Sequence, residues 1–366
     1  MAGRNCFSFI RFVFFSGILT SLLSCHVVRS VYWNVADLQD YKKFPADTLF
    51  HSQTSWVFYD SYGPVRSDSL RFDSLLEQNK TVAFLMVKND TVIYERYFRG
   101  FSRTSTLPSF SIAKSFVSAL LGIAMEEGYI RSIDQPITDF IPQLSDEGMK
   151  KVTLKNLLEM RSGLNFNEGY ANPFGIVTKY YYGLNLRKYT LKLKTATEPD
   201  SLYQYQSANT QLLAMAIENA TGRPLTQYFQ EKIWHFIGIE NDASWSYDSK
   251  KDHEVKAFCC LNASVLDFAK FGRLILNQGL WNGQEIIPSK WVKESFRIQN
   301  NSKDSEGYAY TYGWRVTPEG DFYAKGVGGQ YLYVCPHHRM LILRFGSKYE
   351  NMAWPPFFRK LCHPHN

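Results

Sequence analysis

The stretch FSIAKSFVSALLGIAMEE, residues 110–127, decides the fold. Its central part, Phe116–Met125, is nearly all apolar. The pattern predicts a helix over 111–127 that is buried on most of its sides, because an exposed helix would carry a polar face. Such a helix needs other layers of structure around it.

Strand patterns stand toward both ends of the chain, and helical patterns lie between them. A hairpin is predicted around Asn89-Asp90 from the runs Thr81–Lys88 and Thr91–Phe98. Four more strands are predicted at Tyr312–Thr317, Asp321–Lys325, Gln330–Cys335 and Met340–Phe345. Helices are predicted at Thr153–Met160, Thr210–Ala220, Leu225–Ile237 and Ala263–Asn277.

This order predicts an α+β fold, an α/β sandwich. We expect one antiparallel sheet built from the N- and C-terminal strands, with the helix over 111–127 packed on it. The region from about 130 to 300 forms a mostly helical second lobe, and the cleft between the lobes is the natural place for a substrate. Residues 26–75 are expected to be an irregular lead-in, 76–350 the main domain and 351–366 a tail.

Composition excludes several classes of protein. The 366 residues suggest two domains or one with a large insertion. With 45% hydrophobic and 20% charged residues, the chain is neither disordered, collagen-like nor a coiled coil. The net charge falls from +7 to +5 without the two arginines of the first 24 residues, which is too mild to indicate nucleic-acid binding.

The first 25 residues have the pattern of an export signal. An apolar run over 12–24 follows the two arginines and is too short to span a membrane comfortably. It ends in Leu22-Leu23-Ser24-Cys25, which resembles the lipobox of bacterial lipoproteins. The resemblance implies cleavage before Cys25 and lipidation of its thiol, on the periplasmic side of a bacterial membrane. The alternative is an ordinary signal peptide or an uncleaved anchor.

The remaining cysteines are predicted to be small buried hydrophobes. They are Cys259, Cys260, Cys335 and Cys362. The adjacent pair would not bridge easily, and no spacing typical of zinc ligands occurs. His363 and His365 lie at the C-terminus, where a frayed end is more typical than a metal site. We therefore expect no metal and no cofactor.

Ser111 and Lys114 form the only Ser-x-x-Lys of the chain. Residues at i and i+3 share one helix face, with Cβ atoms about 5–6 Å apart. The helix N-terminus favours negative charge on an attacking oxygen. Desolvation favours the neutral amine of the lysine, which can then take the serine proton. The alternative is an N-cap serine followed by a surface lysine.

Further segments follow this motif in order. They are Leu157–Leu164, Tyr205-Gln206-Ser207 with Leu212-Leu213 and Thr221-Gly222, Phe268–Asn282 with Trp281-Asn282-Gly283, and Gly326–Gly329. Together with Phe110–Lys114, the set resembles the serine beta-lactamase-related family. The nearest branch holds class C beta-lactamases, D-alanyl-D-alanine carboxypeptidases, esterases and 6-aminohexanoate-dimer hydrolases. The resemblance covers residues from about 80 to 346.

The resemblance implies hydrolysis through an acyl-enzyme. Ser111 matches the nucleophile, and Lys114 matches the neighbouring base. Tyr205 matches the tyrosine of a Tyr-x-Asn box, which shuttles a proton to the leaving group. The backbone N–H groups of Ser111 and Val327 would form the oxyanion hole.

Two departures from the family pattern affect substrate binding. Ser207 stands where the box has asparagine, and Asn209 is the less favoured substitute. In the third box, Ala324 falls at the position of the family's lysine, and Lys325 at that of its threonine. A shift by one residue along a strand reverses the face, so Lys325 is expected to leave the cleft if this alignment holds.

The candidates for substrate contacts are Ser207, Lys325 if its side chain reaches the cleft, and two residues at the Gly-rich end of this strand. Gly326 belongs to the box itself, and Gln330, just after the glycines, is either a substrate ligand or an ordinary strand residue. We expect an exported serine hydrolase acting on a small ester or amide, with weak beta-lactamase activity. The alternative is a non-catalytic, penicillin-binding-like envelope lipoprotein that serves as a sensor or ligand-binding module. The expected partners are a small molecule and, through Cys25, a membrane, with no nucleic acid.

Overall fold

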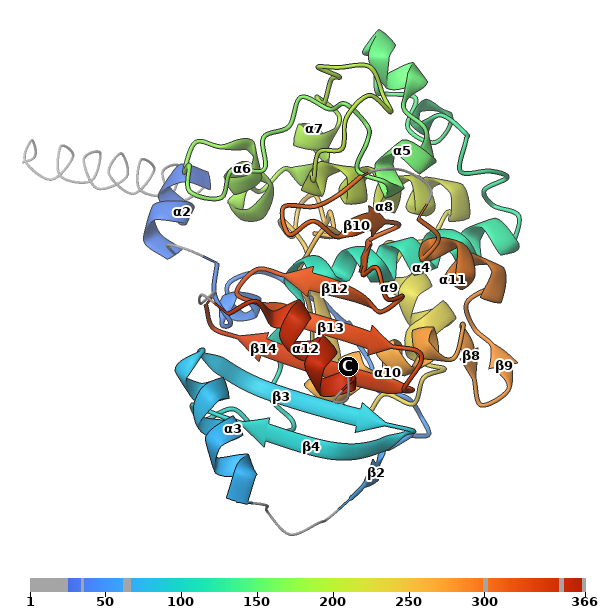
Figure 1. Ribbon diagram of the computed structural model, residues 1–366. Helices are drawn as coiled ribbons and strands as arrows, with labels where there is room; N and C mark the ends of the chain where they lie inside the picture. Colours follow the sequence, from blue (N-terminus) through green and yellow to red (C-terminus); the bar gives the residue numbers. More distant parts are fainter. Residues whose placement is uncertain (1–25, 34–35, 62–66, 299–301, 349–351, 364–366) are drawn as a thin grey trace, which may run out of the picture.

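The computed structural model describes residues 26–33, 36–61, 67–298, 302–348 and 352–363 (Figure 1). The predicted export signal and Cys25 lie outside these residues. The centre of the molecule is an eight-stranded sheet with the order β10-β11-β12-β13-β14-β3-β4-β2. Its strands are β10 Ala309–Thr311, β11 Trp314–Val316, β12 Phe322–Gly326, β13 Gln330–Cys335, β14 Met340–Gly346, β3 Thr81–Lys88, β4 Thr91–Tyr97 and β2 Tyr59–Asp60. Every neighbouring pair is antiparallel except β2 and β4, which confirms the predicted sheet.

The sheet joins distant parts of the chain at its centre. Asn89 and Asp90 have φ values of 49° and 61°, the left-handed conformations that a tight two-residue hairpin turn requires, and they connect β3 to β4. On its other side, β3 pairs with β14. The register begins with Met340 opposite Lys88 and ends with Gly346 opposite Thr81. The N-terminal hairpin therefore extends the C-terminal strands into one sheet, as predicted.

Both faces of the sheet are covered, because the strand side chains alternate between two apolar clusters. On β14, Leu341 and Leu343 belong to the main core, and Ile342 belongs to the second cluster. The main core includes side chains of α4, Ala113–Glu126, and α10, Val265–Leu276. The second cluster is completed by α3, Ser67–Gln78, and α12, Trp354–Cys362. Figure 1 shows α12 lying across the strands of the sheet.

The middle of the chain forms the second lobe. Its helices are α5 Leu154–Leu158, α6 Ile176–Tyr182, α7 Leu186–Thr190, α8 Ser207–Thr221, α9 Leu225–Phe229 and α11 Ser289–Ser295. Helix α4 packs against α8 and so joins the lobe to the sheet (Figure 1). The helix predicted over 225–237 is α9 followed by a π-helical turn, Gln230–Trp234.

A second sheet was not predicted. Its order is β1-β6-β7-β5, with β1 Ala46–Leu49, β6 Ala243–Ser246, β7 Leu261–Ala263 and β5 Leu107–Pro108. The small hairpin of β8, Leu280–Trp281, and β9, Gln284–Glu285, was also missed. Strands of two to four residues are too short to display a period in the sequence.

The predicted irregular lead-in and tail need correction. Between residues 26 and 75 the chain forms α2, His26–Trp33, then β1 and most of α3. The C-terminal residues form α12, whose Trp354 and Phe358 are buried one turn apart against the sheet. Pro355 and Pro356 do not break this helix, because the first turn of a helix needs no backbone N–H from them.

The adjacent cysteines also differ from the expectation. Cys259 and Cys260 are both buried, as predicted, but they are joined by a disulfide. On extended backbone, neighbouring side chains point apart, which opposes such a bridge. Cys260 instead has a φ of 69°.

Within the described ranges, no helix combines the length and apolar character needed to cross a bilayer.

Candidate active site

Ser111 lies in a short 3-10 turn, η2, Phe110–Ile112, which leads directly into α4. The regular helix thus begins two residues later than predicted. Phe110 has a φ of 44°, a conformation that a non-glycine residue keeps only where its surroundings enforce it. The end of β12 lies against this turn, because a Cβ added at Gly326 would be 2.5 Å from the carbonyl oxygen of Ser109. The predicted nucleophile therefore stands at the junction of the sheet and the buried helix.

Lys114 is buried beside Ser111, with 3% of its surface exposed. Its Nζ lies 3.0 Å from the Oγ of Ser111, 3.3 Å from the Oγ of Ser207 and 2.8 Å from the carbonyl oxygen of Phe258. Burial rules out the alternative of a surface lysine. The Ser-x-x-Lys spacing has brought the two side chains into hydrogen-bond contact, as expected.

The partners of Lys114 decide which way its lone pair points when the amine is neutral. The carbonyl of Phe258 can only accept a hydrogen bond. The hydroxyl of Ser207 donates its own proton to the Oε1 of Glu168 at 2.6 Å, so its oxygen is left to accept. These two acceptors take the two N–H groups of a neutral amine. Its lone pair then faces the hydroxyl of Ser111, the arrangement that proton abstraction from a nucleophile needs.

Tyr205 reaches the same place from the segment before α8. Its ring centroid lies 5.1 Å from the Nζ of Lys114 and 5.6 Å from the guanidinium carbon of Arg315. The ring packs edge-on against Tyr310, at 5.8 Å between centroids. Burial raises the pKa of Tyr310, so that phenol stays protonated beside Tyr205. The structure brings Ser111, Lys114 and Tyr205 together, as the sequence predicted.

Glu168 is a site residue that the sequence did not reveal. Its carboxylate accepts the backbone N–H of Ser207 at 2.7 Å and the hydroxyl of Ser207 at 2.6 Å. Ser207 is the first residue of α8, so the carboxylate sits at the N-terminus of that helix, where negative charge is favoured. The residue that departs from the family's asparagine is therefore held in place by an acid from a distant loop.

The candidate site residues of β12 lie on opposite faces of the strand. Gly326 faces the nucleophile turn, and Ala324, two residues earlier on the same face, is buried in the main core. Lys325 lies on the opposite face. Its Nζ contacts the Oε1 of Glu306 at 2.6 Å and lies 5.7 Å from the ring centroid of Tyr331, a member of the second cluster. Lys325 thus lies on the face of β12 opposite Gly326, as the one-residue shift predicts, and its role as a substrate ligand stays a prediction.

Two other candidates have structural partners. The amide of Gln330 bonds both polar groups of Gly346, at 3.0 and 2.8 Å, so it is a strand residue and not a substrate ligand. Asn209 accepts the hydroxyl of Ser162 at 2.6 Å and does not replace the missing asparagine. Val327 follows Gly326 directly and is half-buried. Its role in an oxyanion hole stays a prediction.

Comparisons with known proteins find a family model and relatives that match most of this chain. The model of the family described as Beta-lactamase matches residues 71–351. A 6-aminohexanoate-dimer hydrolase from Paenarthrobacter ureafaciens is 26% identical over 322 residues, covering 80% of this chain and 78% of the relative.

Solved structures share the fold. A candidate 6-aminohexanoate-dimer hydrolase from Bacillus anthracis superposes with a TM-score of 0.73 at 24% identity, covering 88% of this chain and 91% of that one. A family VIII carboxylesterase superposes with a TM-score of 0.62 at 16% identity, covering 77% of this chain and 90% of that one. With the Ser-x-x-Lys pair at the head of a buried helix and a match over most of its length, the chain belongs to the beta-lactamase family of hydrolases.

Proposed function

We propose that this chain is an exported serine hydrolase that cleaves a small ester or amide through an acyl-enzyme on Ser111. The observation that carries the proposal is the 3.0 Å contact between the Oγ of Ser111 and the Nζ of buried Lys114. A module that only binds a ligand has no need of a buried amine aimed at a serine hydroxyl. Export rests on the pattern of residues 1–25.

The proposed reaction follows from the contacts of Lys114. Lys114, acting as the base, takes the proton of Ser111 as the serine oxygen attacks the substrate carbonyl. The bond to the leaving group then breaks, and the leaving alcohol or amine receives a proton through Tyr205, whose ring lies beside Lys114. Water attacks the acyl-enzyme in the second half, losing a proton to the same groups. The acid product departs, and Ser111 regains its hydrogen.

The substrate preference follows from β12. Beta-lactams carry a carboxylate beside the reactive amide, and a charge-assisted hydrogen bond to it contributes about 1.5–3 kcal/mol. Ala324 offers no such bond, and the cation of Lys325 is on the opposite face of β12 with Glu306. The guanidinium near Tyr205, that of Arg315, is paired with Asp304 at 2.5 Å. We therefore expect faster turnover of short-chain p-nitrophenyl esters than of a chromogenic cephalosporin. Faster turnover of the cephalosporin would contradict this assignment.

The test of the nucleophile uses two serines of the same helix segment. A fluorophosphonate should label the wild-type protein, and Ser111→Ala should abolish both the label and ester hydrolysis, because loss of a nucleophile costs several orders of magnitude in kcat. Ser115→Ala is the matched control, since that hydroxyl donates to the carbonyl of Gly313 at 2.9 Å. Its label should remain. An unlabelled wild type, or a Ser111→Ala variant that keeps more than a few per cent of activity, would favour the ligand-binding module.

A further inference from the structure

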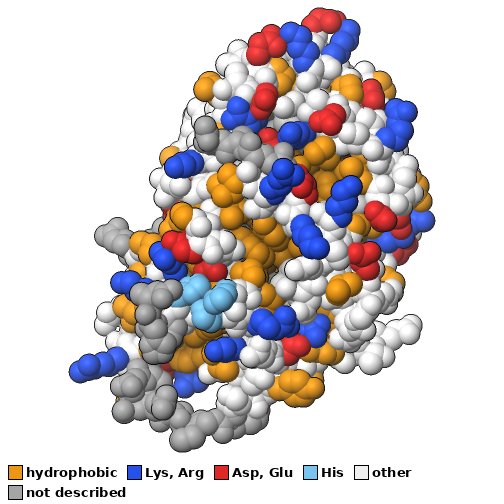
Figure 2. Space-filling model, turned by 45° about the vertical axis from the view of Figure 1, so that its right-hand side comes forward, with side chains coloured by type: hydrophobic (Ala, Val, Ile, Leu, Met, Phe, Trp, Pro, Cys, Tyr) orange, Lys and Arg blue, Asp and Glu red, His pale blue; other side chains and the backbone are white. Residues whose placement is uncertain are grey.

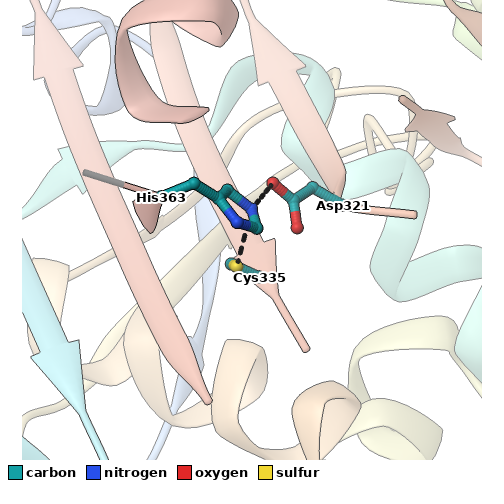
Figure 3. A group of neighbouring side chains, drawn as sticks. All are labelled: Asp321, Cys335 and His363. Atoms are coloured by element: carbon teal, nitrogen blue, oxygen red, sulfur yellow. Dashed lines mark hydrogen bonds and ion pairs between the residues drawn. The ribbon is translucent and has the colours of Figure 1, made fainter. Parts of the chain in front are cut away.

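Three side chains that can bind a metal meet at one end of the central sheet. Asp321 directly precedes β12, Cys335 ends β13, and His363 directly follows α12 (Figure 3). The two strands are antiparallel neighbours with Phe322 opposite Val334, so Asp321 and Cys335 lie side by side at the same edge. Helix α12 then delivers His363 to them. His363 thus lies in a packed cluster, contrary to the expectation of a frayed end, and His365 lies outside the described residues.

The distances in this cluster match those between the ligands of a tetrahedral zinc ion. The Sγ of Cys335 lies 3.5 Å from the Nε2 of His363, and the Oδ2 of Asp321 lies 3.2 Å from the same nitrogen. All three ligand atoms lie within 4.8 Å of one another. Zinc bonds of about 2.3 Å to sulfur and about 2.0–2.1 Å to nitrogen and oxygen give tetrahedral edges of roughly 3.3–3.6 Å.

Hydrogen bonds cannot join all three of these side chains through the ring nitrogen of His363. A ring nitrogen carries either one hydrogen or one lone pair, so the Nε2 of His363 can bond well to only one of its two neighbours. Asp321 and Cys335 are almost fully buried, at 1% and 0% exposure, and the two groups compete for this one ring nitrogen. A cation would bond the oxygen, the nitrogen and the sulfur at once.

The surroundings orient these groups as metal ligands are oriented in proteins. The Nδ1 of His363 lies 3.0 Å from the Nε2 of His338, and when it donates its hydrogen there, Nε2 presents its lone pair to the cluster. The hydroxyl of Tyr333 donates to the Oδ2 of Asp321 at 2.6 Å. Histidine side chains gather on the surface seen in Figure 2, and the rings of His337 and His338 both lie near that of His363.

We propose that Asp321, Cys335 and His363 bind a zinc ion, with water at the fourth position. Mixed oxygen, nitrogen and sulfur donors favour zinc over magnesium or calcium, which prefer oxygen alone. The ion would fasten the end of α12 to the sheet. The cluster belongs to the side of the sheet covered by α12, whereas Ser111 heads the helix on the other side. The zinc would therefore take no part in the hydrolysis at Ser111.

Cobalt is the probe of the site, because its spectrum reports sulfur ligation and geometry. The full chain is stripped with a chelator and titrated with cobalt chloride under reducing conditions. We expect one cobalt per chain, a sulfur-to-cobalt charge-transfer band in the near ultraviolet and the strong visible absorption of tetrahedral cobalt. Cys335→Ser should lose the charge-transfer band. Asp321→Asn and His363→Gln should bind at least tenfold more weakly.

Two controls make the experiment specific. His337→Gln changes a neighbouring exposed histidine and should leave the titration unchanged. Cys362→Ser removes the thiol that hydrogen-bonds Cys335, and it should keep the charge-transfer band, because Cys335 supplies the sulfur. If a ligand variant folds poorly, the melting temperature decides: zinc chloride should raise it for the wild type and not for Cys335→Ser.

Three results would overturn the proposal. The first is a wild-type protein that binds neither zinc nor cobalt stoichiometrically after reduction. The second is a purified chain two hydrogens lighter than expected for the Cys259–Cys260 bridge alone, with a second disulfide mapped to Cys335 and Cys362. The third is cobalt binding that Cys335→Ser leaves intact.

Discussion

Lys114 has a defined partner for each of its hydrogen-bonding directions, and this makes its chemistry testable by substitution. We predict that Lys114→Arg lowers the rate of acyl-enzyme formation by roughly a thousandfold or more, because a guanidinium stays protonated and cannot take the proton of Ser111. The measurement is the burst of p-nitrophenol on mixing with an ester. Circular dichroism of the variant checks that it is folded. A near wild-type burst would show that another group is the base.

Glu168 acts on the site through Ser207, and we predict that Glu168→Gln lowers kcat about tenfold with little change in KM. The amide has one oxygen where the carboxylate has two, so it cannot accept both the N–H and the hydroxyl of Ser207. Glu198→Gln is the control, since that exposed carboxylate pairs with Lys151. In a variant that already carries Ser207→Ala, the Glu168 change should lower kcat little further, because both changes remove the same bond between the Ser207 hydroxyl and the Glu168 carboxylate. If the loss of kcat in the double variant equals the product of the two single losses, the two residues do not act through one shared bond.

At this scale, the sequence predicted the residues that a short motif or a strand period specifies. Ser111 and Lys114 follow from helix geometry, and the face of Lys325 follows from the two-residue period of a strand. Glu168 was not predictable, because it meets Ser207 across 39 positions of chain. That contact depends on the path of a loop, and loop paths leave no period in a sequence.

The junction of α8 and α9 is an element-scale feature that responds to pH. The Oε1 of Glu218, in the last turn of α8, accepts the N–H of Leu225, the first residue of α9, at 2.9 Å. Burial, followed by the charge of Glu254, raises the pKa of Glu218 to about 7. Between about pH 4.5 and pH 7 the folded chain therefore holds a proton that the unfolded chain has released. This group's contribution to the free energy of unfolding falls as the pH rises through that window.

We predict that Glu218→Gln removes this loss. The free energy of unfolding of the variant, minus that of the wild type, should be about 1–3 kcal/mol larger at pH 8 than at pH 5. Urea denaturation at the two pH values measures the gain. Glu147→Gln, a change at an exposed carboxylate, should show no comparable gain. A Glu218→Gln variant that loses stability at pH 8 would mean that the carboxylate is stabilised by its bond to Leu225.

Elements with a strong local signal were predicted well, and those defined by tertiary contacts were not. The hairpin around Asn89-Asp90 and strand β13 have the predicted bounds to within a residue. The strands of the second sheet are too short to carry a pattern, and they exist because β6 has partners on both sides. Helix α12 was missed because the ends of a chain are commonly frayed, and its two prolines lie where a helix tolerates them.

At the scale of the whole molecule, we predict that Cys25 is lipidated and holds the protein on a membrane. Each buried CH₂ of an acyl chain contributes roughly 0.8 kcal/mol, so several chains would anchor the protein firmly. Metabolic labelling with palmitate in a bacterial host measures the modification, and Cys25→Ser should abolish the label and release the protein from the membrane fraction. An unlabelled wild type, or a label that survives in Cys25→Ser, would refute lipidation.

The pairing of β3 with β14 sets the order in which a newly made chain can fold. The Nε of Arg344 on β14 donates to the hydroxyl of Thr81 on β3, across 263 positions of sequence. While the ribosome is still making the middle of the chain, the hairpin of β3 and β4 has no partner on its inner edge. Contacts this distant are slow to form, and the unpaired edge is prone to aggregation until the last strands emerge. For the export proposed above, a sheet that closes only at the end of synthesis would leave the chain unfolded for its passage through a translocation pore.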